Sequence, residues 1–144
     1  MATLEKAIAI AAQAHSGQTD KAGQPYILHP LKVMLRLDDP QQRIAAVLHD
    51  VVEDTDITLE MLAEHGFSPD IRQAIDALTK RKGEDRISAA KRAAADPIAL
   101  AVKLADNAEN MDLSRISAPT DKDFQRLEEY KKVREILLAA QNAS

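Results

Sequence analysis

The chain lacks cysteine and tryptophan altogether and has only two tyrosines, two phenylalanines and four glycines in 144 residues. Without thiols it can form neither disulfide bonds nor thiolate zinc sites, which is compatible with a reducing cytoplasm. No apolar run approaches the roughly 20 residues that a membrane-spanning helix needs. The N-terminus also lacks a basic segment followed by an apolar one. We therefore expect a cytoplasmic protein that does not associate with membranes.

Charge and size narrow the class further. The formal net charge is −4 and the sequence pI is near 5.5, which argues against a general nucleic-acid or anionic-membrane surface. A chain of 15.8 kDa is long enough to bury a core. We expect residues 1–144 to form a single domain whose partner is a small molecule, and the sequence leaves self-association open.

Helical periodicity runs through the chain and is interrupted by glycine, proline and capping residues. No window alternates apolar and polar residues for long enough to predict a strand. The sequence therefore predicts an all-α bundle of about seven to nine helices. Five of the expected helices have both ends predicted: Leu4 to the stop at Gly17, Pro30 to about Leu37, Pro40 to about Asp54, Thr58 to Gly66, and about Asp121 to Gln141. Three more are expected between Gly66 and Asp121: one that begins at Ser68, one that ends at about Ala95, and one that begins at Asp96.

The most informative segment is RIAAVLHDVVEDT, in which His49-Asp50 interrupts an otherwise aliphatic run. Buried carboxylates are costly unless they are paired with a positive charge. At helical spacing, Glu53 lies one turn beyond His49 and Asp54 one turn beyond Asp50. One helix thus presents an imidazole and three carboxylates toward one region, which indicates a cation site. The alternative is a core histidine beside surface acids at a helix end.

A mononuclear metal site can be assembled from the few histidines available. His29 precedes a proline at a helix start, and Asp106 follows an apolar helical run, so both can reach the core. Two imidazoles and two carboxylates suit Mn²⁺, Fe²⁺ or Zn²⁺. No histidine follows His65, which favours one ion over two. The expected ligands are His29, His49, Asp50 and Asp106.

The other two histidines have simpler interpretations. His15 extends the apolar stripe of the first helix, which predicts a core or supporting position. His65 precedes Gly66 and is expected to cap the end of a helix, where it would interact favourably with the helix dipole.

The segments AAQAHSGQTDKAGQPYILHPLKV, AAVLHDVVEDTDIT and VKLADNAENM place these residues in an H…HD…D order. This order resembles the HD superfamily of metal-dependent phosphohydrolases, and the surrounding text resembles the hydrolase domain of RelA/SpoT-type alarmone enzymes and their small stand-alone relatives. The resemblance covers roughly Ala7 to Met111. It implies one Mn²⁺ on the four ligands and an attacking water oriented or deprotonated by Glu53 and Asp54.

The same resemblance implies a substrate and further site residues. The expected activity is removal of the 3′-diphosphate from guanosine tetraphosphate (ppGpp), the alarmone of the stringent response, or from the corresponding pentaphosphate, without alarmone synthesis. Asn110 would face the nucleotide, with a helix-terminal polar residue as the alternative. Tyr26 would shape the pocket, with simple packing as the alternative. Two other functions remain open: cleavage of a different phosphate ester, such as a nucleotide 3′-phosphate, and a catalytically silent nucleotide- or partner-binding module.

Basic residues near these segments are candidates for binding the diphosphate, which needs several positive donors. For each of them the alternative is a solvated surface side chain. The candidates are Lys21, Lys80, Arg81, Lys82 and Lys103.

The sequence departs from the alarmone pattern at the periphery of the site. Asp20 stands where a basic residue is common in the family, and LADNAENMDL carries Glu109 and Asp112 in place of basic or neutral groups. We therefore expect weaker recognition of the base, since a carboxylate cannot provide the stacking or phosphate pairing of a guanidinium.

Overall fold

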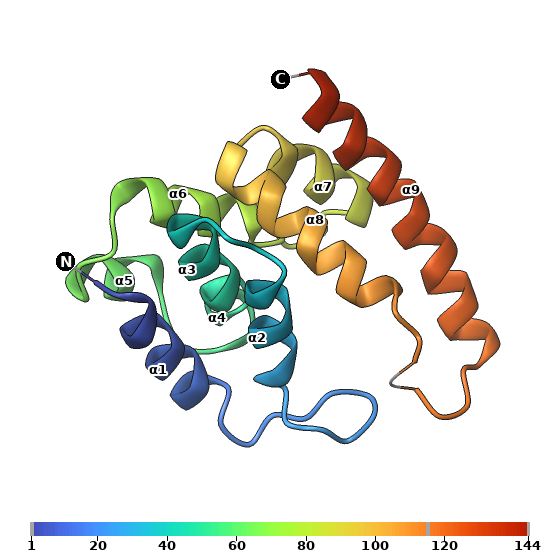
Figure 1. The fold of residues 1–144 in the computed structure, drawn as a ribbon, viewed down its shortest axis with the longest axis horizontal. Helices are drawn as coiled ribbons and strands as arrows, with labels where there is room; N and C mark the ends of the chain where they lie inside the picture. Colours follow the sequence, from blue (N-terminus) through green and yellow to red (C-terminus); the bar gives the residue numbers. More distant parts are fainter. Residues whose placement is uncertain (1, 115, 144) are drawn as a thin grey trace.

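In the computed structural model, which describes residues 2–114 and 116–143, the chain folds into helices joined by short links (Figure 1). Within these ranges the β-structure amounts to an isolated bridge between Thr19 and Pro25. The prediction of an all-α bundle is confirmed. The helices are α1 (Leu4–Ala14), α2 (Leu28–Leu35), α3 (Pro40–Leu48), α4 (Val51–Asp54), α5 (Leu59–Glu64), α6 (Pro69–Leu78), α7 (Arg86–Ala94), α8 (Pro97–Met111) and α9 (Asp121–Ala143).

Side-chain caps fix where several helices begin. Asp39, Ser68 and Asp96 each accept a hydrogen bond from a backbone N–H three residues later, and each is followed by a proline in the first turn. A side-chain oxygen and a proline suit this position because the first backbone donors of a helix have no partner within it. Thr3 and Thr58 cap α1 and α5 in the same way. These helix starts therefore follow from the local sequence.

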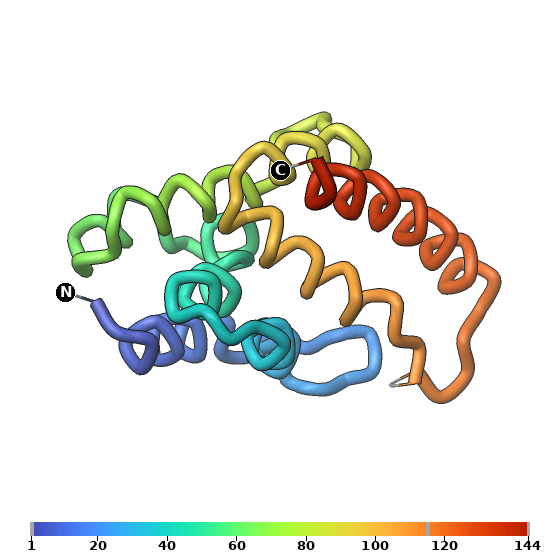
Figure 2. Tube along the Cα trace, turned by 45° about the horizontal axis from the view of Figure 1, so that its top comes forward, coloured from blue at the N-terminus to red at the C-terminus, as the bar shows by residue number. Residues whose placement is uncertain are grey.

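Helix α3 lies at the centre of the fold and packs against α1, α2, α6 and α8. Its residues Ile44 to Leu48 are all buried, and the last four are fully inaccessible. The two views show α3 between the N-terminal helices and the layer formed by α6 and α8 (Figures 1 and 2). Because His49 follows Leu48 directly, the chain delivers the His49-Asp50 pair into the interior.

The expected continuous helix from Pro40 to Asp54 is wrong, because the chain breaks at His49 and Asp50 between α3 and α4. The backbone N–H of His49 bonds to the carbonyl of Ala46, and the imidazole Nδ1 contacts the same oxygen at 2.5 Å. This tight turn replaces the regular helical bond from four residues back. The break turns the His49 ring and the Asp50 carboxylate toward the same region.

Helix α9 packs on α7 and α8 through a second small core of Ala90, Leu100, Val133 and Leu137. Phe124, in the first turn of this helix, lies outside this core and is 51% exposed. A polar contact also joins the two helices: the buried Asn107 amide of α8 donates to the Tyr130 carbonyl of α9 at 2.9 Å. Arg134 lies 3.4 Å from the Asn107 amide oxygen. The Asn107 hydrogen bond therefore fixes the position of α9 along the axis of α8.

In the part of the chain that the structure describes, none of the helices combines the length and the apolar character needed to cross a membrane.

We predict that Asn107→Ala lowers the free energy of unfolding by about 1–3 kcal/mol, because it removes a buried hydrogen bond between α8 and α9. Urea denaturation of the variant and of wild type measures the difference. Asn142→Ala, at an exposed position of α9, is the matched control and should leave stability unchanged. Equal stability of Asn107→Ala and wild type would mean that the contact does not hold α9 in place.

Candidate metal centre

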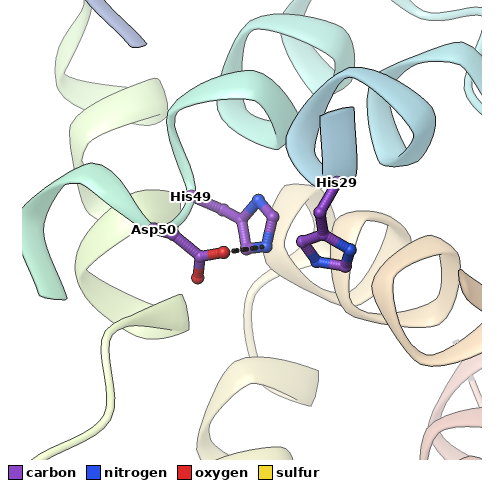
Figure 3. Close-up of side chains that lie close together, drawn as sticks. All are labelled: His29, His49 and Asp50. Atoms are coloured by element: carbon purple, nitrogen blue, oxygen red, sulfur yellow. Dashed lines mark ion pairs between the residues drawn. The ribbon is translucent and has the colours of Figure 1, made fainter. Parts of the chain in front are cut away.

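Three parts of the fold bring four predicted ligands together. His29 lies in the first turn of α2, His49 and Asp50 at the break before α4, and Asp106 in the second half of α8. His29 Nε2 lies 2.8 Å from Asp106 Oδ1, and His49 Nε2 lies 3.5 Å from the same oxygen and 3.1 Å from Asp50 Oδ2. The two imidazoles lie next to one another, with ring centroids 5.7 Å apart and planes tilted by 60°, and the Asp50 carboxylate lies beside His49 (Figure 3). His29, His49 and Asp106 are each less than 9% exposed.

The His49 ring is oriented for an electrophile. Its Nδ1 contacts the Ala46 carbonyl, which can only accept, so Nδ1 carries a proton and Nε2 is the nitrogen that faces the two carboxylates. Among the described residues, buried Nε2 has no hydrogen-bond partner, although two carboxylates lie beside it. Burial opposes protonation, but Asp50 and Asp106 outweigh it and hold the pKa of His49 well above its ordinary value. The carboxylates thus require a positive charge at this nitrogen.

Asp106 stays ionised inside the fold. Burial would raise its pKa, but the Lys103 ammonium and the two imidazoles together hold the pKa well below its ordinary value. Lys103, one turn earlier on α8, lies 3.3 Å from Asp106 Oδ2, while Oδ1 faces the histidines. The two oxygens of one carboxylate therefore serve two different partners.

Tyr26 holds the other carboxylate ligand. Its hydroxyl donates to Asp50 Oδ2 at 2.5 Å, and its ring packs between the rings of His15 and His29. Burial, with Asp50 next to it, raises the pKa of Tyr26, so the phenol remains a donor. Buried His15, at 2% exposure, is the core residue that the sequence predicts.

This donor set fits a divalent cation. One donor atom from each of His29, His49 and Asp50 can be chosen so that all lie within 4.8 Å of one another. Atoms bonded to one ion at about 2.0–2.4 Å are at most about 4.8 Å apart, so the cluster has the right dimensions. Asp106 adds a fourth donor within 3.5 Å of both imidazoles. An ion there would also satisfy the orphaned Nε2 of His49.

The two acids expected to act on water lie on α4, at the rim of the cluster. Glu53 and Asp54 are exposed, and their carboxylate oxygens lie within 4.8 Å of an Asp50 oxygen and of each other. Burial, Asp50 and Glu53 together raise the pKa of Asp54. Glu53 Oε1 accepts a hydrogen bond from the backbone N–H of Lys80 at 2.6 Å. One oxygen of Glu53 is therefore fixed and the other is left for a ligand.

A pocket of about 550 Å³ opens over the cluster. It gathers the predicted ligands and both rim acids. Of the residues proposed to bind substrate, it is lined by Lys21, Tyr26, Lys80, Lys103 and Asn110.

Sequence reasoning missed three residues on the far wall of this pocket, Arg86 of α7 and Arg126 and Tyr130 of α9. The Arg86 guanidinium carbon lies 4.8 Å from the centre of the Tyr130 ring, an arrangement that favours cation–π attraction. The spacing of Arg126 and Tyr130, one helical turn apart, could have signalled a shared face. Which face meets the pocket depends on how α9 packs, and local periodicity does not give that.

Two basic candidates lie elsewhere. Arg81 does not line the pocket; its guanidinium binds the carbonyls of Asp76 and Thr79 and the Asp76 carboxylate. Lys82 is exposed and is likewise absent from the pocket wall. The proposed contacts of these two residues with a diphosphate are therefore not supported.

The acidic departures have distinct local roles. Asp20 lines the pocket, but its carboxylate accepts from the backbone N–H groups of Ala22 and Gln24 and so shapes its own loop. Glu109 is not on the pocket wall and pairs with Arg36 of α2 at 2.7 Å. Asp112 does line the pocket. The acidity expected around the site thus comes from Asp20 and Asp112, and replacing Asp20 would also remove bonds that order the loop.

Known proteins are similar to this chain in sequence and in fold. The family described as HD domain matches residues 7–142. The chain is 35% identical to a probable GTP pyrophosphokinase of Mycobacterium leprae, over 83% of its own length. It is 33% identical, over 75% of its length, to a guanosine-3′,5′-bis(diphosphate) 3′-pyrophosphohydrolase of Aquifex aeolicus. The matched part is 17% of each of these two relatives.

A solved structure of a metazoan orthologue of SpoT, a protein described as hydrolysing ppGpp, superimposes with a TM-score of 0.77 at 26% identity. The similarity covers 97% of this chain and 85% of that one. It therefore includes the elements that carry all four candidate ligands. Because the family model matches nearly the whole sequence, the chain belongs to the HD-domain family, and it is similar to the ppGpp hydrolase domain of SpoT- and RelA-type proteins.

Proposed function

We propose that the chain is a metal-dependent phosphohydrolase that removes the 3′-diphosphate of ppGpp or of the corresponding pentaphosphate. The products would be pyrophosphate and guanosine 5′-diphosphate or 5′-triphosphate. The observation that carries this proposal is the position of Glu53. Its carboxylate lies at the rim of the buried ligand cluster, in the same pocket, with one oxygen fixed by a backbone amide. A binding module would not need an ordered base beside a metal cluster. The substrate class, guanosine 3′,5′-bis(diphosphate), is that of relatives similar to most of this chain.

In this proposal His29, His49, Asp50 and Asp106 hold one ion, and Mn²⁺ is the metal that we propose. Fe²⁺ and Zn²⁺ would suit the same mixture of imidazoles and carboxylates. When bound, the ion would polarise a phosphoryl oxygen and lower the pKa of a water molecule. The protein residues do the rest: they bind the substrate, orient it and move the proton.

Glu53 is the proposed general base. Its Oε1 is engaged by the Lys80 amide, so Oε2 is the oxygen free to take a proton from the attacking water. Asp54, whose pKa is raised by burial and by its acidic neighbours, is suited to orienting that water. As the water oxygen bonds to phosphorus, the bond from phosphorus to the ribose 3′-oxygen breaks, and that oxygen takes up a proton.

Cations on two sides of the pocket suit a substrate with two diphosphates. Lys103 lies next to the ligand cluster and Lys80 beside Glu53, where they would meet the reacting 3′-diphosphate. Arg86 and Arg126 line the opposite wall and would meet the second diphosphate. Asn110, also on the wall, would contact the nucleoside. Tyr26 acts through Asp50 in this scheme, by holding a metal ligand. We further propose that residues 1–144 form one such domain.

The first test is product identity. Purified protein incubated with Mn²⁺ and ppGpp should release pyrophosphate and GDP in equal amounts, as measured by ion-exchange chromatography. A nucleoside 3′-monophosphate under the same conditions is the comparison substrate. Release of orthophosphate from it, with ppGpp intact, would instead indicate a 3′-phosphatase. Failure of both substrates with Mn²⁺, Fe²⁺ and Zn²⁺ would leave only a binding role.

The second test separates the base from the ligands. Glu53→Gln keeps the size and a hydrogen-bond acceptor but cannot take a proton, so kcat should fall by about 10²–10⁴-fold, the usual contribution of a general base. Metal content, measured by elemental analysis, should stay at the wild-type level. Glu60→Gln, at an exposed position of α5, is the matched control and should not change kcat. If Glu53→Gln turns over at the wild-type rate, the base is another group.

A further inference from the structure

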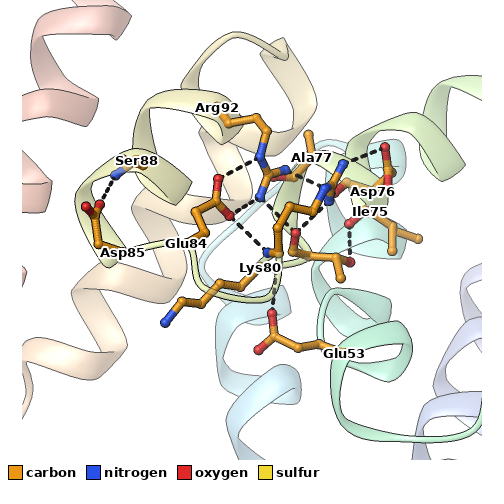
Figure 4. Close-up of polar contacts among 11 residues, drawn as sticks. Glu53, Ile75, Asp76, Ala77, Lys80, Glu84, Asp85, Ser88 and Arg92 are labelled. Carbon is orange, nitrogen blue, oxygen red and sulfur yellow. Dashed lines mark hydrogen bonds and ion pairs between the residues drawn. The ribbon is translucent and has the colours of Figure 1, made fainter.

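The link between α6 and α7 reaches Glu53 through a single peptide unit. The N–H of Lys80 donates to Glu53 Oε1 at 2.6 Å (Figure 4). The carbonyl of the same peptide, which belongs to Thr79, accepts from Arg92 Nη2 at 2.8 Å and from Arg81 Nη1 at 2.7 Å. Because a peptide unit is planar and rigid, fixing its carbonyl also fixes the direction of its N–H.

Arg92 joins this peptide to helix α7, on which it lies, and Arg81 of the link itself also binds the same carbonyl. Besides the Thr79 carbonyl, the Arg92 guanidinium binds the carbonyls of Asp76 and Ala77 at the end of α6, at 3.3 and 2.8 Å. Its Nε and Nη2 donate to the two oxygens of Glu84 at 3.1 and 2.7 Å. A guanidinium has five N–H donors in a fixed plane, and this arrangement uses all of them.

Glu84 keeps the guanidinium in this orientation. Its carboxylate also accepts from the backbone N–H of Arg81, so it closes the link around the peptide. Hydrogen bonds from Arg92 hold the pKa of Glu84 at about 2. The side chains of Arg92 and Glu84 are 27% and 15% exposed, so both partners are mostly shielded from water. The pair is far better ordered than an exposed surface ion pair.

We propose that Arg92 is a positioning residue for Glu53. Its guanidinium, held by Glu84, fixes the peptide between Thr79 and Lys80, and the N–H of that peptide fixes Glu53 Oε1 and leaves Oε2 turned to the pocket. The role of Arg92 is distinct from the metal ligands and from the substrate contacts, since Arg92 does not line the pocket over the cluster. For its effect on turnover, the inference rests on the proposed role of Glu53 as base.

The test compares Arg92→Gln with Arg72→Gln. Arg72 is the matched control because its guanidinium also binds a backbone carbonyl at an end of α6, that of Phe67, but at the end away from Glu53. Arg92→Gln should lower kcat by about 10- to 100-fold, as expected for a displaced catalytic group. Its KM and metal content should stay near wild type. Arg72→Gln should keep kcat unchanged.

A double variant distinguishes positioning from general damage. If Arg92 acts through Glu53, Arg92→Gln should cause no further loss of kcat in a Glu53→Gln background. An equal loss in both backgrounds would overturn the proposal, since a damaged fold affects turnover whether or not the base is present.

A spectroscopic measurement tests the geometry without turnover. The Lys80 amide proton, hydrogen-bonded to a carboxylate, should resonate downfield in the NMR spectrum of wild type and move upfield in both Glu53→Gln and Arg92→Gln. An unmoved Lys80 resonance in folded Arg92→Gln would overturn the proposal. Should Arg92→Gln fail to fold, Glu84→Gln takes its place: the Lys80 amide resonance should again move upfield, by a smaller amount. An unmoved resonance in Glu84→Gln would count equally against the proposal. If Glu53→Gln keeps full turnover, the proposed base fails, while the Lys80 resonance still decides the positioning.

Discussion

The structure depends on a concentration of negative charge that the interior cannot leave uncompensated. Asp50 and Asp106 converge on Nε2 of His49, which is buried with His29 beside it. Such carboxylates are stable inside a protein only if a cation or a proton balances them. Lys103 compensates one oxygen of Asp106, and Tyr26 donates to Asp50. The remaining negative charge of the two carboxylates lies beside the imidazole nitrogens of His29 and His49. Without a metal a protonated His49 balances this charge, and a bound divalent ion would balance it instead.

The surrounding fold keeps these groups in place and leaves the chemistry at the edge. The buried second half of α3, Ile44 to Leu48, ends where the His49-Asp50 pair begins, and the tight turn at His49 directs this pair toward the cluster. Short helix α4 then returns to the surface and presents Glu53 at the pocket rim. Helix α9, joined to α8 through Asn107, contributes Arg126 and Tyr130 to the pocket wall. His29, His49 and Asp106, three of the predicted ligands, are therefore buried, whereas Glu53 and Asp54 are exposed at the rim of the pocket.

Much of this arrangement is legible in the sequence because its causes are local. Caps such as Asp39 and Asp96 and the apolar run before His49 determine the helices, and burying charge in that run indicates a cation site. The break after Leu48 could not be predicted from the sequence. It accompanies a hydrogen bond from the His49 side chain to the Ala46 carbonyl, which competes with the regular hydrogen bonds of the helix. Nor does the sequence reveal Arg126, Tyr130 or the contacts of Arg92, which depend on packing between distant helices. For Asp20 the sequence shows only the charge, whereas the structure adds that the carboxylate shapes its own loop through hydrogen bonds.

Anomalous diffraction from crystals grown with Mn²⁺ is the most direct test of whether His29, His49, Asp50 and Asp106 share one divalent ion. We expect one manganese peak at about 2.0–2.4 Å from the Nε2 atoms of both histidines and from an oxygen of each aspartate. We also expect the peak to be lost in Asp106→Ala. A manganese ion bound instead by Asp50, Glu53 and Asp54, or an undiminished peak in Asp106→Ala, would contradict a site shared by these four residues.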